Sequence, residues 1–484
     1  MTTRAGQAAG AVWRDPAGPV IAAVLLIGVV LRVYLTVRWH PAMVNYSDTG
    51  IYIQDAASGG FSDPLRVVGY GLFLIPLHWL TPHMLLVVLA QHAMGLATAV
   101  LLYLTVRRCG APRLVALLGM AIVALGGMQI FLEHSILSEA LFTFLIALAL
   151  YAAVRTSQGS AWWAVLVGAC LGLSVTVRGA GMVLIPVFSL WLLFAVGRVT
   201  RNEALRAAAA LMASLAVIGG YIGWRHAETG LSGLTSNGNW NLYGRVAPFA
   251  DCTRFTPPSG TEGLCDPTPP DQRQGRNVEW YVYIGDSPAQ KLFGPPYQVS
   301  PDPDANEKLG DFSIAAVRGQ PGDYLDAVWQ DLIRIVDPEH PSDGDLSYNQ
   351  FMLFLLHDAD LDDRNDFVEF WRQVYYPGDV YHWGDINSLE DWERATRVQG
   401  PFMVIVLLLA AAAPWAAPRG SRRPGLLLTA TAFALLVFPI ATHAYDARFV
   451  IPALGPLFAA AGLSAWGLFP PAVRLARDAR ARWT

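Results

Sequence analysis

Apolar runs of about 20 residues alternate with short polar loops over residues 1–224 and again over 401–470. A run of roughly 20 apolar residues is long enough to cross the hydrocarbon of a bilayer as one helix. The stretch at 69–80 is apolar but too short to span, so we expect it to lie at the membrane surface. The pattern predicts a mainly α, polytopic membrane protein with about ten spans, at 19–37, 83–106, 113–132, 136–155, 161–177, 180–197, 205–224, 401–417, 426–442 and 449–468.

One long polar stretch, residues 225–400, interrupts the apolar runs. Its first part, 230–303, is rich in Gly, Pro, Asn and Asp, which favours turns over regular structure. Residues 311–318 and 321–336 then carry apolar side chains at helical spacing. The second of these helices can rest on the membrane surface or pack within its own domain, and the sequence leaves both open. Residues 362–398 are expected to add helix and loop, so the insertion as a whole is predicted to be mixed.

The arginines indicate which way the helices cross the membrane. Cytoplasmic loops are enriched in Lys and Arg. With the N-terminus in the cytoplasm, the short outside loops hold only Arg38, Arg66, Arg178 and Arg448. An even number of spans returns the C-terminus to the cytoplasm. The predicted parts are an N-terminal membrane bundle (1–224) with its first exported loop at 38–82, an exported insertion (225–400), the C-terminal spans (401–470) and a cytoplasmic tail (471–484).

Composition supports this class and excludes others. Apolar residues make up 54% of the chain, charged residues only 15%, and mean hydropathy is +0.36. A soluble globular domain of this length is usually less apolar. The formal net charge of −4 gives no indication of a nucleic-acid partner. We therefore expect a multi-pass protein of the plasma (inner) membrane.

The four cysteines divide by predicted compartment. Cys109 falls in a cytoplasmic loop and Cys170 inside a span, so both should be free. Cys252 and Cys265 fall in the exported segment, where thiols oxidise. A bridge between them would stabilise the fold by about 3 kcal/mol. A zinc site is the weaker alternative, because no second pair of ligands follows at a suitable spacing.

Asp48 is the most informative polar residue. It lies in the loop just after the first predicted span. A carboxylate beside a bilayer is costly unless it is paired or used. At the outer mouth of the bundle it is well placed to act as a general base on a substrate hydroxyl. Asp55 follows two helical turns later and could share its face. Taken alone, a solvated loop acid or a helix cap is the commoner explanation of such a residue.

Other acids and arginines gather on the same predicted side. Arg66 could bind a lipid phosphate through two hydrogen bonds, or only reach toward the headgroups. Glu139 begins the fourth span, where an acid usually faces a cavity or a partner. Glu133 and His134 precede it and would help to orient the site, although a lone histidine is more often structural. The sequence predicts that these residues meet at the outer end of the bundle.

Two further arginines fit the same chemistry. Arg178 lies between two predicted spans and is followed by glycines, which let another group approach the backbone. It could bind phosphate, pair with Glu139, or do both. Arg448 follows Asp446 in the run HAYDARF at 443–449, and either pairs with that acid or binds a phosphate. Together the arginines would neutralise a phosphodiester as it leaves, a carboxylate would take the acceptor proton, and the apolar bundle would hold a prenyl tail.

At this point the chain resembles the C-type (GT-C) integral-membrane glycosyltransferases. Within them it is most similar to the protein-mannosyltransferase and aminoarabinose-transferase branch, in a bacterial, actinobacterial style. The run GYGLF at 69–73 is similar to the family's Gly-Tyr-Pro-Leu-Phe stretch, with Gly71 in place of the proline. The other matching runs are YSDTGIY (46–52), QHAMG (91–95), ILSEALF (136–142), VR (177–178) followed by LIP (184–186), and ARFVIP (447–452).

The resemblance implies a GT-C-like fold and a site on the exported face. Asp48 would be the catalytic residue. The substrate-binding residues it implies are Arg66, Tyr70, Glu133, His134, Glu139, Arg178 and Arg448. No cofactor is required, and a divalent metal ion stays open because some relatives use one. The insertion 225–400 matches no carbohydrate-binding module, so it leaves the acceptor undefined.

The sequence therefore predicts transfer of a sugar, with inversion, from a polyprenyl-phosphate-linked donor to a lipid, glycan or protein of the cell envelope. A polysaccharide polymerase or ligase that uses a lipid-pyrophosphate oligosaccharide is the first alternative. A transporter or flippase is a second, although it usually shows polar groups at the membrane midplane and two related halves. An inactive scaffold subunit is a third, and the presence of Asp48 argues against it.

Overall fold

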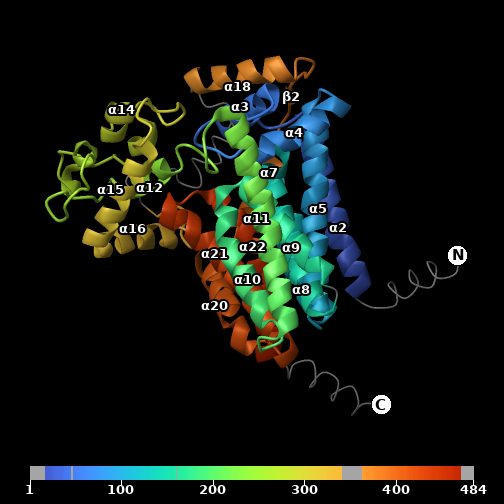
Figure 1. The fold of residues 1–484 in the computed structure, drawn as a ribbon. Coiled ribbons are helices and arrows are strands. Elements are labelled where there is room, and N and C mark those ends of the chain that lie inside the picture. Colours follow the sequence, from blue (N-terminus) through green and yellow to red (C-terminus); the bar gives the residue numbers. More distant parts are fainter. Residues whose placement is uncertain (1–16, 45–46, 160, 341–361, 470–484) are drawn as a thin grey trace, which may run out of the picture.

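The computed structural model describes residues 17–44, 47–159, 161–340 and 362–469. Long helices lie side by side in one bundle. The first residue of α2 and the last residue of α22 both lie at the lower end of this bundle in Figure 1. The segments predicted to be exported lie at the upper end and along one side. The bundle helices are α2 (Ala17–Arg38), α5 (Met84–Arg108), α6 (Arg113–Leu125), α7 (Gly127–His134), α8 (Glu139–Ser157), α9 (Trp162–Val177), α10 (Leu184–Phe194), α11 (Arg201–Thr229), α20 (Gly400–Ala416), α21 (Arg422–Thr442) and α22 (Ala447–Leu468), with the 3₁₀ turns η1 (Gly179–Val183) and η4 (Arg419–Ser421).

Among the described residues, six helices are long and apolar enough to cross a membrane. Two bent pairs, α6 with α7 and α19 (Asn387–Thr396) with α20, raise this number to eight. The helices α9 and η1 with α10 are apolar but shorter. The number of ten predicted from sequence is therefore not confirmed. Large apolar side chains such as Leu26, Val37 and Leu408 are 64–67% exposed on the outside of the bundle, as lipid contact requires.

The predicted span at 113–132 is broken in the structure. The two helices α6 and α7 meet at an angle of 47°. A Cβ atom on Gly127 would lie 2.4 Å from the Cα atom of Glu393 in α19, so the missing side chain is what lets α19 pack at the break. A hydrophobicity pattern records neither this close approach nor the bend that it accompanies.

Short helices form part of the segment for which the sequence predicted turns. They are α12 (Asn239–Val246), α13 (Val278–Tyr283), α14 (Pro288–Phe293), and the 3₁₀ turns η2 (Glu262–Leu264) and η3 (Pro270–Gln272). Their large side chains, among them Trp240, Tyr243 and Tyr281, fill a second core that is separate from that of the bundle. The expectation of turns at 230–303 was wrong at these helices because tertiary packing overrides local preference.

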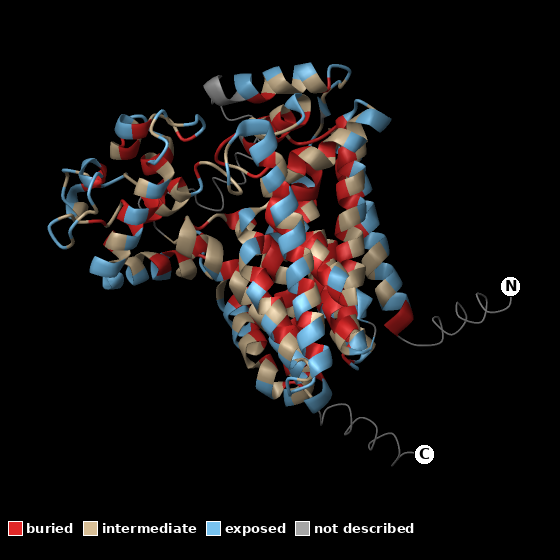
Figure 2. Ribbon diagram, in the orientation of Figure 1, coloured by how far each residue is buried: buried red, intermediate tan, exposed pale blue. Residues whose placement is uncertain are grey.

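A disulfide fastens the same domain. Cys252 and Cys265 are bonded across a sequence separation of 13. Cys109 and Cys170 are free and buried. Buried residues gather between the bundle helices and inside this side domain (Figure 2).

The second amphipathic helix both packs and remains partly exposed. After α15 (Ala305–Gly319), helix α16 (Pro321–Ile333) lies beside α21, and Tyr324 Oη donates to the carbonyl of Ala441 at 2.9 Å. Val328 is buried, whereas Leu325 is 64% and Trp329 is 59% exposed. The helix thus packs on the bundle, which neither expectation from the sequence included, and its exposed stripe leaves a position on the membrane surface open.

Helix α3 (Ser47–Ser58) lies at the upper end of the bundle beside α4 (Gly69–Leu80) and beneath α18 (Asp362–Tyr375) (Figure 1). A Cβ atom on Gly50 would lie 2.7 Å from the ring of Phe367, so α18 packs directly on α3. Strand β2 (His382–Trp383) pairs antiparallel with β1 (Trp39–His40), and these are the only strands in the described ranges. The insertion therefore contacts the chain before Asp48, at β1, and just after it, at Gly50 in α3.

Candidate active site

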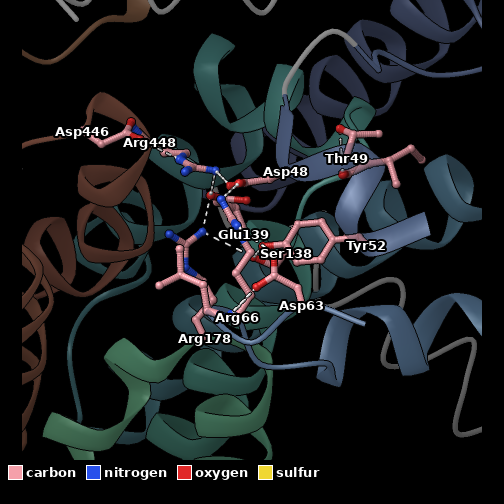
Figure 3. A network of polar contacts seen from close by, with 12 residues as sticks. Asp48, Thr49, Tyr52, Asp63, Arg66, Ser138, Glu139, Arg178, Asp446 and Arg448 are labelled. Atoms are coloured by element: carbon pink, nitrogen blue, oxygen red, sulfur yellow. Dashed lines mark hydrogen bonds and ion pairs between the residues drawn. The ribbon is translucent and has the colours of Figure 1, made fainter. Parts of the chain in front are cut away.

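Asp48 lies in the first turn of α3 and is 4% exposed. Its two carboxylate oxygens accept hydrogen bonds from Arg66 Nη2 and Arg448 Nη1, each at 2.6 Å (Figure 3). Burial alone would raise the pKa of Asp48. The two guanidinium charges outweigh it and hold the pKa well below the usual value for an aspartate. Asp48 is thus an ionised carboxylate between two arginines from distant parts of the chain.

Side-chain contacts fix α3 against the bundle. Thr49 Oγ1 donates to the carbonyl of Ile136 at 3.2 Å, and the hydroxyls of Tyr52 and Ser138 lie 3.1 Å apart. Ile136 and Ser138 stand just before α8. The start of α3 is therefore held by the same short segment that leads into Glu139.

Each arginine near Asp48 also meets a second carboxylate. Arg66 lies 3.3 Å from Asp63 Oδ2, and Arg448 Nε donates to Asp446 Oδ2 at 2.7 Å. Arg178 pairs with Glu139, whose Oε1 also lies 3.6 Å from Arg448 Nη1. These contacts join the loop before α4, the α9–η1 junction, the start of α8 and the start of α22 (Figure 3). The positive charges of the three arginines are compensated by carboxylates.

A cavity of about 500 Å³ opens beside this cluster. Asp48 and all three arginines line it, which brings together residues that the sequence placed in one site. Clefts of this size bind small ligands. Its apolar lining includes Phe142, Met182, Leu435, Phe438, Phe449 and Pro452. Its neutral polar lining includes Tyr52, Thr235, Asn239, Asn241, Tyr283 and Thr442.

Four residues predicted to bind substrate do not line this cavity: Glu139, which pairs with Arg178 of the lining, and three others. Tyr70 is fully buried, and its hydroxyl donates to Gln91 Oε1 at 2.8 Å. Glu133 and His134 are fully buried in a separate polar network within the bundle. A helical pattern does not distinguish the face toward a cavity from the face toward a neighbouring helix. Direct substrate contact by these three side chains lacks support, and the role of Glu133 and His134 in orienting the site stays a prediction.

The buried network has its own closed geometry. Arg32 binds Glu133 through Nε at 2.7 Å and Nη2 at 2.8 Å, and Gln129 donates to the same carboxylate at 2.9 Å. His92 Nδ1 lies 3.1 Å from Glu133, and its Nε2 lies 3.2 Å from His134 Nδ1. All acceptor positions of Glu133 are therefore in use.

His134 also contacts the start of the first exported loop. Its Nε2 atom faces the carbonyl of Trp39 at 2.7 Å and must donate to it, since a carbonyl can only accept. The network of Glu133 therefore extends through His92 and His134 to β1.

The cavity also contains residues that the sequence did not single out as ligands. Asn241 and Tyr283 come from the exported insertion, where no motif marks them. His443 begins the run that contains Asp446 and Arg448, so its place near the arginines could have been inferred from that run. Within the described ranges, no group of three or more His, Cys, Asp or Glu could hold a metal ion.

Residues 85–227 match the family model of dolichyl-phosphate-mannose-protein mannosyltransferases. The matched segment includes Glu139 and Arg178 and leaves out Asp48, Arg66 and Arg448. It confirms the resemblance to the C-type membrane glycosyltransferases. No match is found among curated proteins.

Solved structures of such enzymes share low identity with this chain. The protein O-mannosyltransferase Pmt1–Pmt2 complex of S. cerevisiae, bound to the sugar donor, is 16% identical over 48% of this chain and 36% of that one, with a TM-score of 0.38. The archaeal oligosaccharyltransferase AglB of Archaeoglobus fulgidus, with an inhibitory peptide and a dolichol-phosphate, is 14% identical over 95% and 51%, with a TM-score of 0.43. ArnT of Cupriavidus metallidurans, bound to undecaprenyl phosphate, is 14% identical over 95% and 79%, with a TM-score of 0.35. The chain thus spans between about a third and half of the length of the first two.

Proposed function

We propose that this chain, similar over residues 85–227 to the dolichyl-phosphate-mannose-protein mannosyltransferases, transfers a sugar from a polyprenyl-phosphate donor to a cell-envelope acceptor. The reaction takes place on the exported face and inverts the anomeric centre. The observation that carries the proposal is Asp48, held between Arg66 and Arg448 in the wall of a cavity that is apolar over much of its surface. An anionic lipid headgroup needs guanidinium groups, and its tail needs apolar surface.

The ion pairs suggest how the donor would enter. Both oxygens of Asp48 accept a hydrogen bond from an arginine. A phosphodiester between Arg66, Arg178 and Arg448 would take over part of these interactions. The carboxylate would then face the acceptor with weaker guanidinium contacts and with a pKa closer to its usual value. Donor binding therefore comes first and prepares the base.

In the chemical step, the acceptor oxygen attacks the anomeric carbon while Asp48 takes its proton. The bond between that carbon and the phosphate oxygen breaks, and its electron pair stays on the phosphate. Arg66, Arg178 and Arg448 stabilise the charge that develops there. A single displacement from the face opposite the phosphate gives inversion. No nucleotide takes part.

The test compares two aspartates of the same helix. Asp48→Asn should lower transfer by about 10²- to 10⁴-fold, the usual contribution of a general base. Asp55→Asn is the matched control, because Asp55 is also buried in α3 but does not line the cavity. Transfer is measured in nanodiscs with a panel of radiolabelled polyprenyl-phosphate sugars. Near-normal transfer by Asp48→Asn, or no transfer by the unaltered protein from any donor of the panel, would overturn the proposal.

Mass spectrometry of the lipid product separates the polymerase or ligase alternative. A donor of the proposed kind leaves a polyprenyl monophosphate. A lipid-pyrophosphate oligosaccharide leaves a pyrophosphate, and detection of that product alone would replace the proposed donor.

A further inference from the structure

His443 stands out among the residues that line the cavity. It follows directly after the last residue of α21, Thr442, and it lines the cavity together with Asp48 and Arg448. Its Nδ1 atom is buried and has no hydrogen-bond partner. The carboxylate and the three arginines of the lining are all engaged in ion pairs. His443 therefore has a hydrogen-bonding position that the rest of the site does not use.

The proposed reaction creates a negative charge that the arginines of the cavity lining do not balance. A sugar phosphodiester carries one negative charge, whereas the polyprenyl phosphate left behind carries close to two, since its second pKa lies near 6. The arginines of the lining already face Asp48, Asp63, Glu139 and Asp446. Among the described residues of the lining, only His443 can gain a positive charge, because the lining contains no lysine and no second histidine.

The surroundings keep the His443 ring neutral until a new anion arrives. Burial lowers its pKa to about 4; Asp446 opposes this effect, and the arginines add to it. A phosphate with two charges in the same cavity acts in the opposite direction and favours the imidazolium. The charged groups that face the ring are Arg66 from the loop before α4, Arg245 on α12 with its partner Asp331 on α16, and Asp446 and Arg448 at the start of α22.

We propose that His443 is a catalytic residue that takes up the acceptor proton and pairs, as an imidazolium, with the leaving polyprenyl phosphate. This inference rests on the proposed function. The acceptor O–H bond breaks, and its proton goes first to Asp48. The bond from the anomeric carbon to the phosphate breaks, and the phosphate keeps the electron pair. Asp48, a weak base, passes the proton through water in the cavity to the imidazole. One proton on His443 then offsets the second negative charge of the phosphate.

The experiment measures binding of two lipids and needs no transfer. Undecaprenyl phosphate carries the second charge, and its methyl ester, a phosphodiester, does not. Near pH 7, binding of the monoester should draw at least about half a proton more into the unaltered protein than into His443→Gln. Calorimetry in buffers of different ionisation enthalpy counts these protons. His443→Gln should also bind the monoester roughly tenfold more weakly and bind the diester as the unaltered protein does.

Two further variants keep the result interpretable. His443→Lys supplies a permanent cation, so it should keep the monoester affinity without proton uptake. His382→Gln changes an exposed histidine outside the cavity and should match the unaltered protein. Equal weakening for both lipids, or unchanged proton uptake in His443→Gln, would overturn the role of His443 and leave the glycosyltransferase proposal standing. If the unaltered protein binds neither lipid, the proposed donor class fails and this inference fails with it.

Discussion

Two carboxylates of this chain bind arginine in nearly the same way, and only one of them lies beside a cavity. Asp48 accepts from Arg66 and Arg448 at 2.6 Å and lines an open volume of about 500 Å³. Glu133 accepts from Arg32 at 2.7 and 2.8 Å but is enclosed by the bundle. The same pairing can therefore prepare a site in one place and hold helices together in another. Contact of the carboxylate with an open cavity, and not its pairing with arginine, is what indicates a functional site.

The largest expected difference between the two carboxylates is in their contribution to stability. Glu133→Ala would leave Arg32 buried without a counter-charge, which should cost about 3–5 kcal/mol of unfolding free energy. Asp48→Ala should cost clearly less, because water in the cavity can solvate the arginines that it leaves. Thermal unfolding of both variants in the same detergent checks this. Equal losses would mean that the cavity cluster is as enclosed as the bundle network.

A third carboxylate, Asp55, sharpens the comparison because it has no arginine. Its Oδ1 accepts from Ser62, whereas its Oδ2 is buried without a partner. Burial raises the pKa of Asp55 from 3.8 to about 7. The folded state therefore prefers the protonated acid. Its stabilising effect is complete below the unfolded pKa of about 4 and is lost as the pH rises through about 7.

Asp55→Asn should remove this dependence. The rise from 3.8 to about 7 corresponds to on the order of 4 kcal/mol at most. The unfolding temperature of the unaltered protein should fall, relative to that of Asp55→Asn, from about pH 5 to about pH 8. A constant difference between the two proteins over that range would show that Asp55 titrates normally.

The sequence predicted which types of residue gather at one end of the bundle, but it did not predict the contacts among them. Asp48, Arg66, Arg178 and Arg448 stand out because acids and arginines are unexpected beside exported loops. That rule alone places them at one end of the bundle. It does not predict that Asp48 and Arg448, 400 positions apart, share a hydrogen bond. Spacing along a chain carries no information on which distant helix ends meet.

The same lack of information on distant contacts explains why two residues predicted for the site lie outside the cavity. Glu133 and His134 are polar and come just before the run ILSEALF (136–142), which is similar to the family pattern. The break at Gly126 and Gly127 turns α7 so that these side chains face Arg32 and His92. His443 is the opposite case, because the run HAYDARF places it near the arginines but gives no sign of its role. Its significance depends on a cavity and on the lack of a partner, which only coordinates provide.

The next prediction concerns the geometry of the arginines. Arg448 uses Nη1 for Asp48 and Nε for Asp446 at the same time, and a lysine has no such fork. Arg448→Lys should therefore lower transfer about tenfold, equivalent to ~1.4 kcal/mol, with little change in unfolding temperature. Arg32→Lys is the matched variant of the enclosed pair, and it should lower the unfolding temperature with no specific loss of transfer per folded molecule. A reversed pattern would exchange the roles assigned to the two arginines.

The smallest expected effect tests whether the enclosed network reaches the site. His134 holds the carbonyl of Trp39 through its side chain, and its own carbonyl accepts from the amide of Met43 at 3.0 Å, on the segment that leads to α3. Loss of the side-chain bond in His134→Gln should cost about 1 kcal/mol of stability, as for one neutral hydrogen bond. If the network only supports the bundle, transfer per folded molecule stays unchanged. If it also orients Asp48, kcat falls while binding of undecaprenyl phosphate is retained, and the separation between the two carboxylates would be less complete than their surroundings suggest.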